Sequence, residues 1–192
     1  MDLIPKRLQI DPQALDARLL WSKTQQSVHA TFQRLVGKCE QVKGTRGCVL
    51  VTTGEVPEHW IAAFNLAMAH SFSAPTMLVD ATNKAHVQKD LLQVPLSSDQ
   101  NLSLVSPQFM LLSMSPEVLF ATQWPSSVDG LVGEHMFALV HTRDVFKLDW
   151  TLSTGEVVVV ALAAPTELEE ERWHRLAELV GSERFLGLWV ID

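Results

Sequence analysis

The sequence contains no tyrosine among its 192 residues and only two cysteines. The absence of tyrosine excludes tyrosine phosphorylation of this chain. The two cysteines, Cys39 and Cys48, are too few for a disulfide framework and lack the Cys-x-x-Cys spacing of redox motifs. We therefore expect both to be reduced, structural thiols, as is usual in cytoplasmic proteins.

Basic residues are scarce: 15 lysines and arginines stand against 22 aspartates and glutamates, and the formal net charge is −7. Neither residues 47–83 nor residues 90–142 contain a lysine or an arginine. Binding to a nucleic-acid backbone depends on clustered lysines and arginines. The composition therefore argues against nucleic acid as a partner.

Long apolar runs are also missing. No stretch approaches the roughly 18 to 20 apolar residues that a membrane-spanning helix needs. Residues 1–20 mix charged and apolar side chains and lack the continuous apolar core of a signal peptide. We therefore expect a cytoplasmic protein that reaches a membrane only through a partner.

Short β-branched, apolar runs alternate with helical stretches along most of the chain. The predicted strands are 48–52, 76–80, 102–105, 137–141, 156–162 and 186–191. The predicted helices are 58–70, 86–92, 116–121, 128–134 and a last one that opens with a capping box from Thr166 to Glu169. Continuously apolar strands that alternate with helices are typical of a mainly parallel sheet covered on both faces. The sequence thus predicts a three-layer α/β fold.

The N-terminal part of the chain is predicted to be a helical extension. Residues 12–41 have the apolar spacing of an amphipathic helix, and Gly44 to Gly47 would join this helix to the first strand. The sequence has no internal repeat and no obvious linker. We therefore predict a single α/β domain over 1–192, with 1–45 as its N-terminal helical extension.

The turn after the first predicted strand is where an open parallel sheet usually binds phosphate. Here the turn has one glycine, Gly54, and no lysine. Pro57 lacks a backbone N–H, and the carboxylates of Glu55 and Glu58 would compete with a phosphate for the positive end of the helix. We therefore do not expect this turn to hold a nucleoside triphosphate in the usual way.

Several short motifs resemble the bacterial tyrosine kinases, a branch of the partitioning-ATPase-like P-loop proteins that works in capsule and exopolysaccharide production. The resemblance covers about residues 25–192. The matching segments are 32–35, 47–53, 64–69, 77–81, 91–95 and 115–119. This resemblance implies a P-loop NTPase-like fold of the partitioning-ATPase type.

The departures from the family's pattern fall on its chemistry. Trp60 or Ile61 stands where the lysine and serine or threonine of the phosphate-binding loop should be, Thr82 replaces the second aspartate of Asp-Ala-Asp, and His141 replaces the metal-organising aspartate. The C-terminal tyrosine cluster is missing. The phosphate clamp, the magnesium carboxylate and the phosphate acceptor are therefore lost together. The degenerate nucleotide-site positions are Gly54, Glu58, Trp60, Asp80 and His141.

Each of these positions also has a structural interpretation. Asp80 could cap a helix or a loop, Trp60 could pack in the core, and His141 with His59 and His135 could be isolated histidines rather than metal ligands. Six tryptophans are more than one core holds easily, and exposed tryptophans often anchor interfaces. The candidate interface residues are Trp60, Phe32 and Arg34.

The sequence predicts a bacterial pseudoenzyme: a catalytically inactive P-loop-like protein with no catalytic residue, cofactor or metal. The resemblance implies an interaction or regulatory subunit of an exopolysaccharide synthesis or export system, at the cytoplasmic side of the inner membrane. The expected partner is an active kinase, a chain-length membrane protein or a synthase, and a homo- or hetero-oligomer fits as well. Fold analogy alone does not establish this role.

Two alternatives stay open. The first is a residual ATP-binding or ATP-hydrolysing protein with an unorthodox loop, in which Thr52, Thr53, Asn65 and Asp80 would bind the nucleotide. The second is a spatial-positioning protein of the partitioning type, for cell division or secretion.

Overall fold

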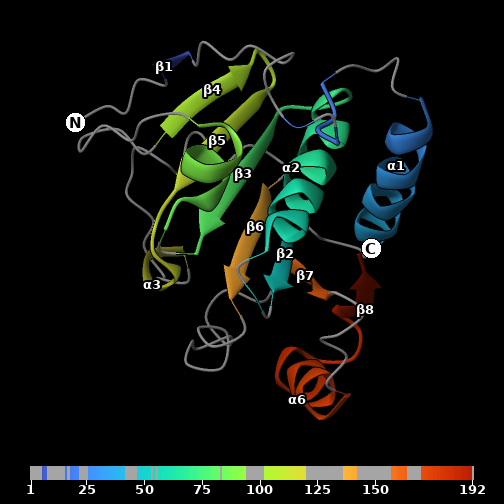
Figure 1. Ribbon diagram of the computed structural model, residues 1–192. Coiled ribbons are helices and arrows are strands. Elements are labelled where there is room, and N and C mark those ends of the chain that lie inside the picture. The colour runs from blue at the N-terminus through green and yellow to red at the C-terminus, as the bar shows by residue number, and fades with distance from the viewer. Residues whose placement is uncertain are drawn as a thin grey trace.

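Eight strands form one sheet with helices on both of its faces (Figure 1). The structure is a computed structural model, and the residues it describes are 6–7, 16, 18–21, 26–41, 47–52, 54, 56–82, 84–93, 102–119, 136–141, 157–163 and 170–191. The strands are β1 (Lys6–Arg7), β2 (Gly47–Thr52), β3 (Thr76–Ala81), β4 (Leu102–Ser106), β5 (Phe109–Ser113), β6 (Met136–His141), β7 (Val157–Ala163) and β8 (Phe185–Val190). The helices are α1 (Gln26–Glu40), α2 (Pro57–Ser71), the π-helix η1 (Val87–Leu91), α3 (Pro116–Leu119) and α6 (Glu170–Val180).

The strand order across the sheet is β1-β4-β5-β3-β6-β2-β7-β8. Every neighbouring pair is parallel except β4 and β5, which are antiparallel. Parallel strands need helical crossovers that cover the faces of the sheet, so their side chains are buried on both sides. The predicted three-layer, P-loop-like α/β fold is therefore confirmed.

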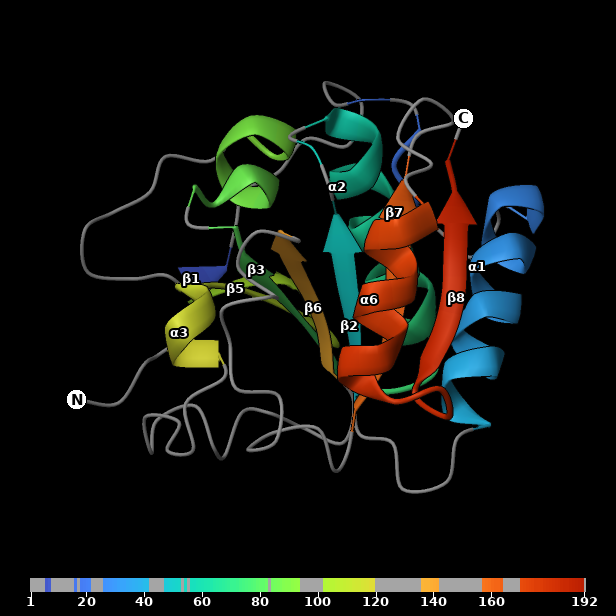
Figure 2. The same ribbon diagram turned by 90° about the horizontal axis from the view of Figure 1, so that it is seen from below.

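The sheet separates two apolar cores. In β2, Cys48 and Leu50 face the core shared with α1, α2 and η1, whereas Val49 and Val51 face the core shared with α3 and α6. Figure 2 shows α6 in front of the sheet and α1 and α2 behind it. Alternation along a strand sends successive side chains to opposite faces, which explains why one strand serves both cores.

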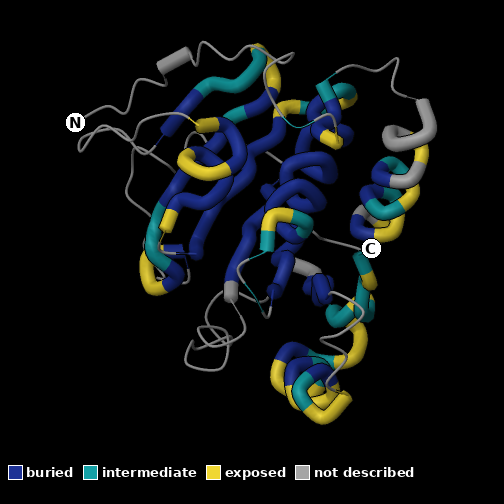
Figure 3. Tube along the Cα trace, in the orientation of Figure 1, coloured by how far each residue is buried: buried dark blue, intermediate teal, exposed yellow. Residues whose placement is uncertain are grey.

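Helix α2 is the most enclosed of the described helices. All its residues from His59 to Ser71 are buried, and Figure 3 shows it as buried along most of its length. A helix that is apolar all round must be covered on every side. The sheet covers one side, and α1, η1 and residues 19–21 pack into the same core around the helix.

The observed elements differ from the predicted ones in four places. Strand β1 lies within the predicted N-terminal helical extension 1–45 and pairs with β4. Among the described residues of the predicted helix 12–41, Gln26–Glu40 are helical and residues 18–21 are not. The predicted short helix 86–92 is a single π-helical segment. Strand β5 lies where no strand was predicted, because only the two turn residues Pro107 and Gln108 separate it from β4. The capping box at 166–169 and the helix at 128–134 fall outside the described residues.

None of the helices in the described part of the chain is long and apolar enough to cross a membrane.

Replacing the central aromatic of α2 tests this arrangement. Phe64 is fully buried, and its ring lies 5.4 Å from that of Trp21 and 5.2 Å from that of Phe109. We expect Phe64→Ala to lower the free energy of unfolding by about 3–5 kcal/mol, because it leaves a cavity among these rings. Guanidinium unfolding followed by circular dichroism measures the loss.

The matched control is Val118→Ala, on an exposed position of α3, which should cost less than about 0.5 kcal/mol. Equal losses in the two variants would contradict the central place of α2 in the core.

Candidate functional site

The carboxyl ends of the central strands meet the start of α2, and Figure 2 shows the arrowheads of β6, β2 and β8 pointing toward the same edge of the sheet. Strand β2 lies between β6 and β7, and Thr52 at its end is in register with His141 of β6 and Leu162 of β7. From β2 the chain passes through α2 to β3, on the far side of β6, and β7 lies on the other side of β2. Ligands of open α/β sheets bind at such a reversal of strand order, so we examine this edge as the candidate site.

The first turn of α2 offers little to an anion. Val56 is the N-cap residue and makes no side-chain cap, and Pro57 follows it without an N–H. The N–H of Glu58 bonds to that residue's own carboxylate, and the N–H of His59 donates to the carbonyl oxygen of Val56 at 3.2 Å. Anion binding at a helix N-terminus depends on such N–H groups pointing outward. Here the N–H is absent at Pro57, and the N–H groups of Glu58 and His59 are bonded within the chain.

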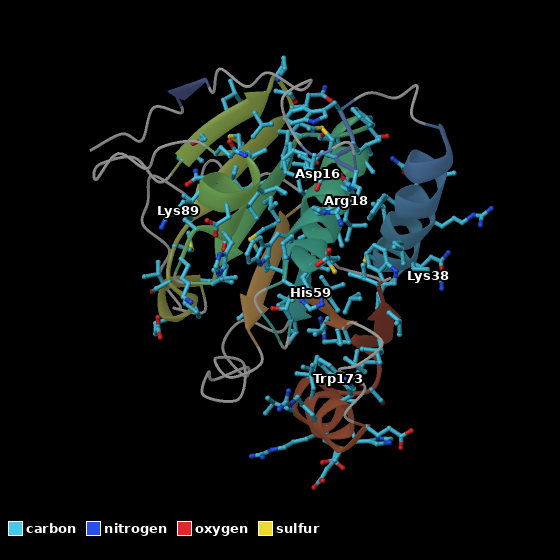
Figure 4. The ribbon with its side chains drawn as sticks, viewed as in Figure 1. Asp16, Arg18, Lys38, His59, Lys89 and Trp173 are labelled. Atoms are coloured by element: carbon cyan, nitrogen blue, oxygen red, sulfur yellow. The ribbon has the colours of Figure 1, made fainter. Side chains whose placement is uncertain are left out.

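Arg18 brings positive charge to this end of α2, but two carboxylates share it. Its Nη2 lies 2.6 Å from Oδ2 of Asp16, and its Nη1 lies 3.1 Å from Oε1 of Glu58. The side-chain hydrogen bonds from Arg18 lower the pKa of Asp16 to about 2. The backbone N–H of Glu58 and then the Arg18 guanidinium also lower the pKa of Glu58. Figure 4 shows Asp16 and Arg18 close together beside α2.

Asn65 fixes the segment that carries Arg18. Its Nδ2 donates to the carbonyl oxygen of Arg18 at 2.8 Å, and its Oδ1 accepts from the N–H of Leu20 at 2.7 Å. Leu19 and Leu20 then enter the core. The side-chain amide of Asn65, which the alternative ATP-binding hypothesis assigns to nucleotide, is thus bound to the protein's own backbone.

Trp60 lies inside the protein, stacked on a histidine. Its ring lies 4.1 Å from that of His86, with an interplanar angle of 11°. Nδ1 of His86 lies 2.6 Å from Oδ2 of Asp90 on η1. The position that would hold the phosphate-binding lysine or its neighbour therefore carries a buried aromatic stack.

Asp80 is fully buried at the end of β3, and both its oxygens are in use. Its Oδ1 accepts from the N–H of Thr82 at 3.1 Å and from the Thr82 hydroxyl at 2.6 Å, and its Oδ2 accepts from the N–H of Val87 at 2.7 Å. The carboxylate therefore organises the loop from β3 to η1. This geometry supports the interpretation of Asp80 as a capping residue.

The structure places the remaining predicted site residues as follows. Gly54 is half-buried in the turn between β2 and α2, and His141 is the last residue of β6. Of the three candidate interface residues, only Arg34 is exposed. Phe32 is buried, and its ring lies 5.4 Å from that of Trp189, so it is not presented at the surface. Trp60 is likewise buried.

The four described tryptophans all contact the interior, and they divide between two cores, in keeping with the expectation that one core could not easily hold all six. The two-sided sheet resolves this crowding: Trp21, Trp60 and Trp189 pack into one core and Trp173 into the other. Trp124 and Trp150 lie outside the described residues.

Cys39 and Cys48 are both buried and form no disulfide. The hydrogen bond between their thiols, together with burial, raises the pKa of Cys48. A raised pKa disfavours the reactive thiolate, in keeping with structural thiols. Within the described part of the chain, no group of three or more histidine, cysteine or acidic side chains could hold a metal ion.

The sequence analysis missed three residues that shape this edge: Asp16, Arg18 and His86. The first two lie in a stretch whose apolar spacing predicts a helix, which hides their local turn. Within that turn, Asp16 accepts from the N–H of Arg18 at 2.9 Å, a pattern that aspartate two residues upstream often makes. This Asp-x-Arg spacing is the signal that could have revealed the turn.

No protein-family model matches the sequence, and no curated protein matches it. Among solved structures, the chain is similar to the chimerical protein CapA2B2, with a TM-score of 0.56 and 11% sequence identity. The match covers 99% of this chain and 93% of that chain. At this identity the likeness shows the fold alone, which is the three-layer P-loop-like α/β architecture.

Removing the Asn65 amide tests its role in fixing residues 18–20. We expect Asn65→Ala to cost about 1–3 kcal/mol of stability, because it leaves a buried backbone donor without its partner. The amide of Leu20 should then exchange with solvent faster than in the unaltered protein, as measured by hydrogen exchange. An exposed change on α1, Arg34→Ala, serves as the control, and an unchanged exchange rate at Leu20 in Asn65→Ala would contradict this role.

The ion pairs of Arg18 make a prediction about pH. A carboxyl whose folded-state pKa is lowered stabilises the fold above its usual pKa near 3.9, and this stability is lost as the pH falls toward its folded value. Asp16 should therefore titrate at about 2, and Arg18→Ala should raise its pKa. Carboxyl NMR titration measures both values. Arg34→Ala should leave them unchanged; an Asp16 pKa that does not respond to Arg18→Ala would refute the assigned contact.

Proposed function

We propose that this chain is a catalytically inactive P-loop-like protein that acts as an interaction or regulatory subunit of a bacterial exopolysaccharide synthesis or export system. One observation carries the first part of this proposal. The first turn of α2, where a phosphate would bind, has no N–H at Pro57 and uses those of Glu58 and His59 within the chain.

Electrostatics at this turn also oppose a triphosphate. Two like charges about 4 Å apart repel by about 4 kcal/mol at the effective dielectric near a protein surface. A helix N-terminus attracts an anion by only about 0.3–1 kcal/mol at an exposed site. A phosphate next to the Glu58 carboxylate is therefore repelled more than the helix attracts it, and Arg18 already pairs with both Asp16 and Glu58.

The carboxylate of Asp80, at the position that would bind magnesium, also makes hydrogen bonds within the chain. A metal ion bound by Asp80 would have to replace hydrogen bonds from Thr82 and Val87, which hold the loop after β3. A carboxylate that satisfies buried backbone donors is costly to withdraw from them. The alternative of residual ATP binding is weakened for the same reason, since Asp80 and Asn65 are two of the four residues it needs.

The biological setting rests on the motif resemblance to the bacterial tyrosine kinases, and the likeness to CapA2B2 supports a distant relationship at the level of the fold. A fold kept without its nucleotide chemistry is suited to binding a protein partner. The partners we propose are an active kinase, a chain-length membrane protein or a synthase at the cytoplasmic side of the inner membrane. The fold alone does not decide between them.

Calorimetric titration with ATP and magnesium tests the loss of nucleotide binding. We expect no binding heat up to millimolar nucleotide, and no phosphate release above the buffer rate. An active bacterial tyrosine kinase, titrated in the same buffer, is the positive control. Binding with a dissociation constant in the micromolar range would overturn the proposal and favour the residual ATPase.

A further inference from the structure

Strand β8 forms one edge of the sheet, and among the described residues only β7 pairs with it. Edge strands are usually protected from other chains by charged side chains or proline. The six residues of β8, Phe-Leu-Gly-Leu-Trp-Val, include neither. Leu186 and Val190 are exposed, at 37% and 42%. Within the part of the chain that the structure describes, no further strand covers this edge.

The backbone of β8 presents hydrogen-bonding groups to that side. The N–H of Ile191 donates to the carbonyl oxygen of Ala163 in β7 at 2.9 Å. Because these groups alternate in direction along a strand, the N–H and C=O of Leu188 and Val190 point away from β7. An irregularity at Leu186 and Gly187 breaks the register at the start of the strand, so the regular outward ladder begins at Leu188.

A groove of about 210 Å³ runs beside this edge, between α1 and β8. Its lining is mostly apolar and consists of Leu35, Lys38, Cys39, Leu66, Val160, Leu186, Gly187, Leu188 and Trp189. Gly187 has φ +119°, and a Cβ built on it would meet no atom within 4 Å. The groove is therefore open above Gly187 and has room for apolar side chains of an added strand.

The charge on the rim of the groove is positive. Lys38 lines it, and Arg34 lies one helical turn earlier on α1; both side chains are exposed. No acidic side chain occurs among the described residues that line the groove. In a chain of net charge −7, this is a local reversal of sign. Such a rim favours a partner segment with acidic residues beside its apolar ones.

The same charges disfavour a second copy of this chain as the occupant. Antiparallel pairing of two β8 strands would continue the sheet and place both α1 helices on the same face, side by side across the junction. Each α1 would bring Arg34 and Lys38 toward the like charges of the other. Like charges set against each other across an interface suppress association.

We propose that the groove between α1 and β8 binds an extended apolar segment with acidic flanks from a partner protein, which adds to β8 as a further strand. This inference rests on the proposed role as an interaction subunit and names the surface that performs it. Backbone hydrogen bonds to Leu188 and Val190 would supply affinity, and the groove and Lys38 would supply specificity.

Two synthetic peptides test the proposal on the full chain. Both have a Val-Thr-Val-Thr-Val centre; one has glutamates at both ends and the other has lysines. We expect the glutamate peptide to bind about tenfold more tightly than the lysine peptide. The amide signals of Leu188 and Val190 should shift on binding, as measured by NMR.

Two variants separate the contributions of charge and backbone. Lys38→Glu should weaken the glutamate peptide about two- to fivefold, whereas Lys89→Glu, an exposed lysine on the far side of the molecule, should not (Figure 4). Val190→Pro removes an outward N–H without removing a bond to β7, and should weaken binding about tenfold. Circular dichroism checks that each variant is folded.

Three outcomes would overturn the inference: no peptide binding, equal binding of both peptides, or shifts that fall away from β8. Slow amide exchange at Leu188 and Val190 in the free chain would also overturn it. In that case the edge of β8 is already covered. Sedimentation then measures the oligomeric state, and so distinguishes cover by a second copy from cover by a segment of the same chain. Nucleotide titration of the same sample is independent of these results. An experiment that contradicts peptide binding at the groove can therefore be distinguished from one that contradicts the proposed catalytic inactivity.

Discussion

The burial of α2 is the constraint on which the rest of the structure depends. Its sequence is apolar or small on nearly every side, so it cannot lie on the surface of the sheet as an amphipathic helix would. The chain covers it with α1, with η1 and with residues 19–21, which Asn65 fixes in place. The same cover closes the first turn of the helix. The ion pair of Glu58 with Arg18 and the packing of the core thus depend on the same segment of the chain.

The polar groups at the carboxyl edge follow from this enclosure. Buried polar groups usually find partners, and the side chains of Asn65 and Asp80 find theirs within the chain. Asp80 satisfies the loop to η1, and His86 pairs with Asp90 while stacking on Trp60. In an active P-loop protein, groups at this edge are kept for ligand and metal. In this chain the hydrogen bonds of Asp80 and His86 maintain the fold.

The sheet could be predicted from sequence because its signal is local. Continuous apolar runs define β2, β3, β6, β7 and β8. Two strands were missed: β1, which has only two residues, and β5, which follows a two-residue turn. The candidate site could be predicted only in part. The scarcity of positive charge and the proline at the first turn are visible in the sequence. The hydrogen bonds of Asn65 reach Leu20 and Arg18, which lie 45 and 47 positions earlier in the chain. No local sequence pattern predicts them. Burial of Phe32 was likewise not predicted, and burial of Trp60 was only one of two interpretations, because both depend on elements distant in sequence.

A crystal structure of this chain grown with millimolar ATP and magnesium tests the central claim most directly. The account predicts an unchanged edge, with Trp60 stacked on His86, the Glu58 carboxylate paired with Arg18, and no triphosphate at the start of α2. Density for a triphosphate on the first turn of α2, with Trp60 displaced from His86, would contradict it.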